Sequence, residues 1–127
     1  MTIKDVINML VKADGYRVWI VDNADTYAHF STPKGNIMTV SRCYWGNGFH
    51  FTLNYKANRN CGTGCSCHGD TDEWDWGLTA VTVKGIEELE AEGLRFASQL
   101  KAPMYVNVDE FLAYKRKFWK KKLREVV

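Results

Sequence analysis

The chain has 127 residues, of which 46% are hydrophobic and 25% charged. These proportions are typical of a globular protein and exclude disorder for most of the chain, and the length predicts one domain, 1–127, that can bury a core without disulfides. The formal net charge of +2 is unevenly distributed. Ten Lys and Arg oppose fourteen Asp and Glu in residues 1–114, a balance of −4, whereas 115–127 holds seven basic residues and one acidic residue, a balance of +6. The sequence therefore predicts a molecule with two oppositely charged ends.

The N-terminal stretch does not have the pattern of a signal peptide, because charged residues interrupt it at Lys4, Asp5 and Lys12. No apolar run approaches the roughly 18–20 residues that a membrane helix needs. We therefore expect a cytoplasmic protein without membrane contact. In a reducing compartment, clustered cysteines are more typical of metal ligands or free thiols than of disulfides.

The first predicted element is a helix from Thr2 to Asp14. Its apolar residues recur with helical spacing, at Ile3, Val6, Ile7, Leu10 and Val11. Thr2 is a suitable N-terminal cap, and Gly15 can adopt the left-handed conformation that ends a helix.

Short β-rich segments follow the first helix and are separated by turn-forming residues. Phe49 to Lys56 has the clearest pattern, because apolar and polar residues alternate along its whole length. Short turns between consecutive strands favour an antiparallel meander. The predicted strands are 16–21, 26–32, 37–44 and 49–56, with a fifth strand at 76–83.

The turn at 45–48 also predicts which side chains face one another. If those four residues form the loop, Cys43 lies opposite His50 on the polar face of the sheet. A thiol beside an imidazole can form an activated nucleophile, but a plain sheet-face pair or a remote metal ligand fits the same pattern. By a similar register His29 lies near Val40, where a packed and hydrogen-bonded histidine is expected.

Two helices are predicted in the C-terminal part of the chain. The first spans 86–101, with its acidic residues near its N-terminus, where the helix dipole favours them. The second follows a capping box formed by Asn107 and Glu110 and continues to Val126. The predicted fold class is α+β: an antiparallel β-meander of four to five strands, an N-terminal helix and two C-terminal helices, with the first and last helices on the apolar face of the sheet.

A loop rich in cysteine and glycine is predicted at 58–75. Its candidate zinc ligands are Cys61, Cys65, Cys67 and His68. The spacing differs from the usual pair of cysteines two residues apart, and a full site would need His68 in place of one cysteine, or a remote ligand such as His50 or Cys43. A loop without metal and a disulfide are the alternatives.

The same loop carries an acidic run that can act in two ways. Its residues can hold a hard cation, although they lack the ligand order of a calcium loop, or they can form a solvated loop that contacts a basic protein surface. Trp74 adds an aromatic group at the edge of this loop. The predicted partner-binding residues of the loop are Asp70, Asp72, Glu73 and Trp74.

A basic run in the last predicted helix is the second candidate contact surface. Clustered Lys and Arg release counterions when they bind nucleic acid, and they also suit an acidic protein surface or simply a solvated helix face. Phe118 and Trp119 lie within the run, but helical spacing assigns them to the core. The basic residues are Lys115, Arg116, Lys117, Lys120, Lys121, Lys122 and Arg124.

The stretch from Gly48 to Gly64, GFHFTLNYKANRNCGTG, resembles a segment of small accessory proteins of bacteriophages and plasmids. In those proteins an aromatic strand runs into a Tyr-Lys-x-Asn-Arg-x-x-Gly-x-Gly loop. Here Ala57 stands where proline is expected, and the cysteines and His68 are additional. The resemblance implies a protein of the anti-defence type, similar to anti-CRISPR proteins, that would act in the host cell cytoplasm.

These observations favour a non-enzymatic protein that binds and inhibits a bacterial host defence protein or a protein–nucleic-acid complex. The usual enzyme signatures, such as phosphate-binding loops and nucleophile motifs, are absent from the sequence. The alternative is a zinc-stabilised nucleic-acid-binding module that uses the basic C-terminal helix, and an enzyme dependent on cysteine or metal is a third hypothesis.

Overall fold

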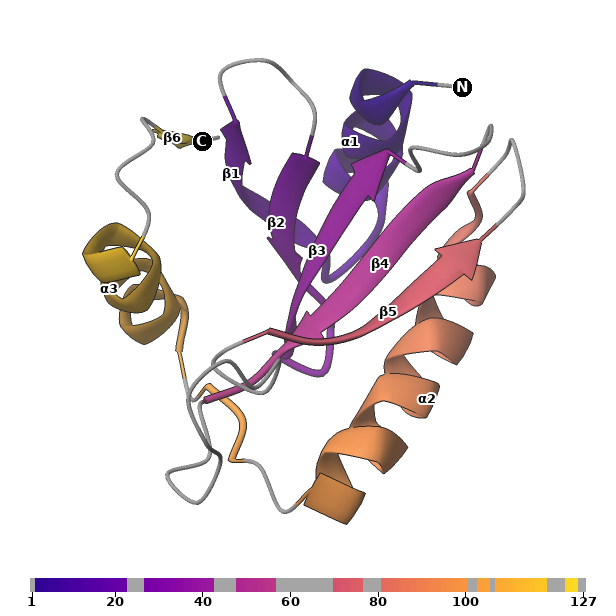
Figure 1. Ribbon diagram of the computed structural model, residues 1–127. Coiled ribbons are helices and arrows are strands. Elements are labelled where there is room, and N and C mark those ends of the chain that lie inside the picture. The colour runs from indigo at the N-terminus through magenta and orange to yellow at the C-terminus, as the bar shows by residue number, and fades with distance from the viewer. Residues whose placement is uncertain are drawn as a thin grey trace.

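The computed structural model describes residues 2–22, 27–42, 48–56, 70–76, 81–100, 103–105, 107–118 and 123–125. Three helices and six strands lie in these ranges (Figure 1). In chain order they are α1 (Ile3–Lys12), β1 (Arg17–Asp22), β2 (Tyr27–Ser31), β3 (Ile37–Arg42), β4 (Phe49–Asn54), β5 (Asp70–Trp76), α2 (Val83–Leu100), α3 (Val108–Phe118) and β6 (Leu123–Glu125). None of the described helices is long and apolar enough to cross a membrane.

The six strands form one antiparallel sheet in the order β5-β4-β3-β2-β1-β6. The first five strands follow one another as a meander, because each pairs with the next strand in the chain. The predicted α+β class and antiparallel meander are therefore confirmed. The sixth strand was not predicted: it comes from the C-terminal end of the chain and pairs with β1 at the far edge.

Alternation along the strands gives the sheet one apolar face, which carries the main core. Phe30, Phe49 and Phe51 lie on this face and are fully buried. The apolar sides of α1 and α2 cover it, with Val6 and Ile86 at 0% exposure. Aromatic rings of Phe30 and Phe51 meet edge to face at 6.3 Å between centroids, a favourable arrangement for buried rings.

The opposite face of the sheet packs against α3, which corrects the prediction that the last helix shares the apolar face with α1. Ile37 forms a second core with Phe111 and Leu112 of α3. Figure 1 shows α3 apart from both α1 and α2. The prediction was wrong because it assigned all large apolar residues to one layer, whereas Ile37 precedes Met38 on the strand and therefore points to the other side.

The local signal at the N-terminal end of α1 is confirmed. The Thr2 hydroxyl accepts a hydrogen bond from the backbone N–H of Asp5 at 3.2 Å, and the Asp5 carboxylate accepts one from the Thr2 backbone N–H at 2.7 Å. This is a complete capping box. At the other end the prediction is corrected, because the helix ends at Lys12 with an extended Ala13 as its C-cap, and Gly15, with a φ of 81°, lies in the turn that follows.

A buried carboxylate links α2 to the turn between β2 and β3. Glu90 is 1% exposed and accepts hydrogen bonds from the Thr32 hydroxyl and from Asn36 Nδ2, the latter at 2.9 Å. Burial of a charged group is costly unless it is hydrogen-bonded, and both donors come from the same turn. The turn therefore fixes the position of α2 over the sheet.

The segment 70–76 forms β5, which corrects the prediction of a loop over 58–75 and of a strand over 76–83. Only Trp76 of the predicted strand belongs to β5. Acidic residues are rare in strands, so the acidic run was interpreted as a loop. Backbone pairing with β4, from Phe49↔Trp76 to Asn54↔Asp70, overrides that local preference.

The third predicted helix is shorter than expected, because α3 ends at Phe118 and Leu123–Glu125 forms β6. The predicted continuous helix to Val126 is therefore wrong. Its residues from 123 to 125 instead complete a ladder with Ile20, Val21 and Asp22 of β1. Such a pairing joins residues far apart in the chain, and local periodicity does not reveal it.

Candidate functional site

The polar side chains of the sheet gather on the face opposite the main core. They occupy alternate positions of three central strands, and the register sets them in rows that cross the sheet. Part of this face lies against α3, and the remaining part lies beside β5. The residues that form it are His29, Ser31, Thr39, Ser41, His50, Thr52 and Asn54.

A chain of hydrogen bonds links three of these residues across β2, β3 and β4. Asn54 Nδ2 donates to Thr39 Oγ1 at 2.9 Å, and Thr39 Oγ1 lies 2.6 Å from His29 Nδ1. Because Thr39 accepts from Asn54, its own proton can be donated to His29, which leaves the histidine proton on Nε2. His29 is 3% exposed and meets the Phe111 ring of α3 nearly edge-on at 5.1 Å.

The predicted role of His29 as a packed, hydrogen-bonded histidine is thus confirmed, although its neighbour differs. His29 lies opposite Thr39, and Val40 pairs with Ala28 instead. A shift of one residue exchanges the two faces of a strand. Thr39 therefore supplies the hydrogen bond that an apolar valine cannot offer.

Asn54 ends this chain with an unpaired oxygen. Its side chain is 0% exposed, and its Nδ2 also points to the Ile37 carbonyl oxygen at 3.4 Å. Both contacts of Nδ2 lie on β3, so Oδ1 of the same amide is turned away from that strand. Oδ1 is buried without a hydrogen-bond partner among the residues described. A buried acceptor of this kind costs about 1–3 kcal/mol if no donor or cation reaches it.

His50 lies in the next part of the same face. Its observed cross-strand pairing corrects the predicted pairing with Cys43. Its cross-strand partner on β3 is Ser41, because β3 ends at Arg42 and the loop before β4 is longer than the four residues assumed. The shift of two residues keeps His50 on the polar face but replaces the thiol by a hydroxyl. Cys43 itself lies outside the described residues.

On its other side His50 pairs with Asp75 of β5. The next row in the same direction pairs Thr52 with Glu73. His50 Nδ1 is buried and has no hydrogen-bond partner within the described part of the chain. Two unpaired polar atoms, one on His50 and one on Asn54, therefore occur on the same face of β4, beside the acidic strand.

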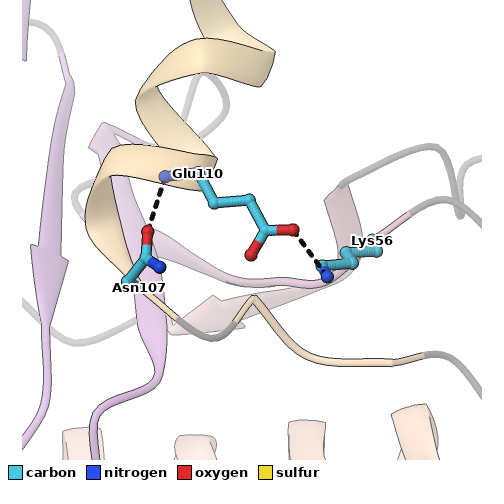
Figure 2. Close-up of polar contacts among 3 residues, drawn as sticks. All are labelled: Lys56, Asn107 and Glu110. Atoms are coloured by element: carbon cyan, nitrogen blue, oxygen red, sulfur yellow. Dashed lines mark hydrogen bonds and ion pairs between the residues drawn. The ribbon is translucent and has the colours of Figure 1, made fainter.

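A polar contact holds α3 at the end of β4. Lys56 Nζ lies 2.5 Å from the Glu110 carboxylate, and Asn107 Oδ1 accepts a hydrogen bond from the Glu110 backbone N–H at 2.8 Å (Figure 2). The predicted cap at Asn107 is confirmed by this bond. Both charged side chains are about a third exposed, so the ion pair contributes roughly 0–1 kcal/mol. It positions the helix more than it stabilises the fold.

The edge of the face near β1 carries an aromatic group held by polar contacts. Trp19 Nε1 donates to Ser31 Oγ at 2.8 Å, and the Arg17 guanidinium lies 3.8 Å from the centre of the Trp19 ring. A cation over an indole face is favourable. Trp19 is therefore fixed in place next to the α3 core.

The predicted zinc ligands lie outside the described residues, so their arrangement stays a prediction. These are Cys61, Cys65, Cys67 and His68. Among the side chains that the structure describes, no group of three or more His, Cys, Asp or Glu residues is placed to hold a metal ion. The hypothesis of a zinc loop rests on the sequence.

The predicted partner-binding residues fall on two separate elements. Asp70, Asp72, Glu73 and Trp74 belong to β5 at one edge of the sheet. The basic run is divided, because Lys115, Arg116 and Lys117 belong to α3 and Arg124 to β6, while Lys120, Lys121 and Lys122 lie outside the described ranges. The register positions of Glu73 and Asp75 opposite Thr52 and His50 were missed, since no local signal marks 70–76 as a strand.

No model of a known protein family, no curated protein and no solved structure matches this chain. Its function therefore has to be inferred from its own residues.

Proposed function

We propose that this protein is a non-enzymatic accessory protein of the phage type, which binds and inhibits a bacterial defence protein or a protein–nucleic-acid complex. The resemblance of residues 48–64 to small phage and plasmid proteins suggests the class. The observation that carries the proposal is the position of the two charged segments relative to the sheet.

The acidic strand β5 and the strand β6, which contains Arg124 of the basic run, lie at opposite edges of the sheet. β5 contributes four acidic residues among its seven and forms one edge, next to β4. β6 forms the other edge, next to β1, and α3, which carries the start of the basic run, lies on that side (Figure 1). With about 4.8 Å between neighbouring strands, five steps across the sheet separate the two edge strands by roughly 24 Å.

Charged edges of this kind suit the recognition of another macromolecule. Complementary charge speeds the encounter with a partner and fixes its orientation, while repulsion excludes wrong partners. Separated acidic and basic edges would select a partner with two complementary patches. This supports a binding protein that recognises one partner in one orientation.

The contacts of His29 also favour binding over catalysis. His29 is the histidine in the middle of the sheet. Its ring packs against Phe111, and its Nδ1 is hydrogen-bonded to Thr39. A histidine held this way stabilises the seam between α3 and the sheet. It is not available as an exposed general base.

The experiment is a pull-down from bacterial lysate with the tagged full-length chain, with and without nuclease, followed by mass spectrometry. We expect a stoichiometric protein that survives nuclease treatment. Reversal of the basic run by Lys120→Glu, Lys121→Glu and Lys122→Glu should reduce its recovery at least about tenfold, as should Asp72→Lys with Glu73→Lys, because each removes one of two complementary patches.

A matched control separates local charge from net charge. Lys4→Glu, Lys12→Glu and Lys84→Glu change the net charge as much as the basic-run variant but alter exposed lysines on or beside α1 and α2. This variant should retain the partner. Equal recovery with all three variants would contradict the proposed surface.

The same experiment tests the alternative of a zinc-stabilised nucleic-acid-binding module. That module would lose its partner on nuclease treatment and bind nucleic acid with a steep dependence on salt. It would also have to use α3 and β6 together, since the basic run is not one continuous helix.

A further inference from the structure

An arginine and a tryptophan of β1 form a fixed pair at the surface beside α3. The guanidinium carbon of Arg17 lies 3.8 Å from the centre of the Trp19 ring, and the Arg17 side chain is exposed. Trp19 Nε1 donates a hydrogen bond to Ser31 Oγ at 2.8 Å, and the Trp19 side chain packs against the second core, which contains Phe111 of α3. The indole is thus held by a hydrogen bond and by packing, and its face holds the cation.

A β-bulge places Trp19 in this position. The register of β1 with β2 shifts between Val18 and Ile20, so Trp19 is the additional residue of the bulge and has no cross-strand partner of its own. Bulges re-aim side chains, and they are common at the edges of sheets and next to functional sites. The ring of Trp19 reaches instead to Arg17 and Ser31, which face each other on the two strands.

The charge of Arg17 is not used by an ion pair among the described side chains. The ion pairs of these residues are Lys56 with Glu110 and Arg95 with Glu92. A guanidinium that lies over an aromatic ring keeps its N–H donors, which point outward in its plane, and such a flat cation can stack on a second flat group. Arg17 therefore presents a positioned cation to the solvent.

The helix next to this pair adds further positive charge. Trp19 packs against the core cluster that contains Phe111, which places α3 beside it. β6 follows α3 in the chain and pairs with β1, so the C-terminal end of the helix leads back to the strand of Arg17 (Figure 1). A positive field from two neighbouring elements attracts a polyanion. The last turn of α3 carries the basic residues Lys115, Arg116 and Lys117.

We propose that Arg17, held over Trp19, is a binding platform for single-stranded nucleic acid. A base stacks on the outer face of the guanidinium, and neighbouring phosphates contact the basic turn of α3. Unpaired bases expose the flat faces that arginine planes and aromatic side chains recognise, and a basic groove follows the backbone of the strand. An acidic protein segment would match the charge, but its carboxylates would leave the stacking face of Arg17 unused.

This inference deepens the proposed function, because it names the nucleic acid of a protein–nucleic-acid complex as a ligand. It rests on that proposal only for its biological role, since the contact can be measured with the protein alone. It also differs from a module that uses the C-terminal basic run and zinc, because its central residues belong to β1.

The test measures the binding of fluorescently labelled oligothymidine and oligouridine to the full-length chain by anisotropy, over a range of salt concentrations. We expect both single strands to bind, with an affinity that falls as salt rises. Arg17→Ala should weaken binding about tenfold, the size of the loss of one stacked base. Arg17→Lys should weaken it nearly as much, because lysine keeps the charge but lacks the flat group.

Arg42→Ala is the matched control. Arg42 is an exposed arginine whose guanidinium lies 5.9 Å from the centre of the Phe49 ring. It is at the opposite end of β3 from Ile37, the residue of β3 in the same row as Arg17. The control removes the same charge and should leave the affinity nearly unchanged. Unfolding curves show whether each variant is folded, and Arg17→Lys alone decides if Arg17→Ala is not.

Four outcomes would overturn the platform. These are no binding by the natural chain, equal affinity of Arg17→Ala and Arg42→Ala, unchanged affinity of Arg17→Lys, and equally tight binding of polyglutamate, which would assign the surface to an acidic protein. None of them affects the nuclease-resistant protein expected in the pull-down, so this inference and the proposed function fail separately.

Discussion

At the scale of single residues, two glycines have the same backbone conformation and different surroundings. Gly15 has a φ of 81° and Gly35 a φ of 86°. A Cβ atom at Gly15 would lie 2.9 Å from Cβ and Cγ of Pro33, whereas a Cβ at Gly35 would meet nothing within 4 Å. Gly15 therefore serves both the backbone conformation and a close approach of two turns.

This difference makes a testable prediction. Gly35→Ala should lower the free energy of unfolding by about 1 kcal/mol, the cost of a left-handed conformation for an L-residue. Gly15→Ala should lower it by about 2–3 kcal/mol, because the contact with Pro33 adds to that strain. Chemical denaturation of both variants measures the difference. Equal losses would show that Pro33 moves away at no cost.

Tyr16 is a second residue whose environment has a measurable consequence. Its hydroxyl is buried without a hydrogen-bond partner among the described residues, and burial, together with Glu87 and Glu90, raises the pKa of Tyr16 above 10.0. The folded state thus favours the neutral phenol. The contribution of Tyr16 is complete below the unfolded-state pKa of about 10 and is lost as pH rises through the raised value.

We therefore expect the free energy of unfolding to fall as pH rises above about 9, and to fall less in Tyr16→Phe. At pH 7 the variant should be as stable as the natural chain or up to about 1 kcal/mol more stable, since it removes an unpaired hydroxyl. Denaturant titrations of both chains across this pH range provide the measurement. The other tyrosines cancel in the comparison, so parallel curves would contradict the effect.

At the scale of elements, the segments that were predicted correctly are those whose own residues repeat with a clear period. In α1 the helical spacing and the cap at Thr2 indicate the same element, and the structure agrees with both. In β4 strict alternation places Phe49 and Phe51 in the core and His50 on the opposite face. For such segments local preference and tertiary packing agree.

The segments that were predicted wrongly are those whose structure depends on a distant partner. β5 contains four acidic residues, and only its pairing with β4 makes it a strand. β6 follows a basic run that continues a helical pattern, and its pairing with β1 decides otherwise. The row that joins His50 to Asp75 could not be predicted for the same reason, because it requires both the length of the loop before β4 and the position of β5.

At the scale of the whole molecule, the short strand β6 covers the outer side of β1 and becomes the edge of the sheet. β6 pairs with Ile20, Val21 and Asp22 of β1. Unpaired edge strands offer N–H and C=O groups to other chains and promote association. β6 thus protects β1 as well as carrying the end of the basic run.

A chain shortened to end at Phe118 tests this protective role. We expect it to have a lower free energy of unfolding and to self-associate, because the outer side of β1 is exposed. Denaturant titration and light scattering measure the two effects. The control is the full-length chain with Lys120→Ser, Lys121→Ser and Lys122→Ser, which loses the charge and keeps β6. Association of the control to the same extent would assign the effect to charge.

The pairing of β1 with β6 also has a consequence for how the chain is made. The ribosome releases the N-terminal end first, and β1 can pair with β2 as soon as the hairpin has emerged. The outer side of Ile20 can pair only after Glu125 has been synthesised, more than one hundred residues later in the chain. Contacts between residues so distant form late because closing a long loop costs entropy. The outer side of the first strand therefore stays open until residues 123–125 have been synthesised.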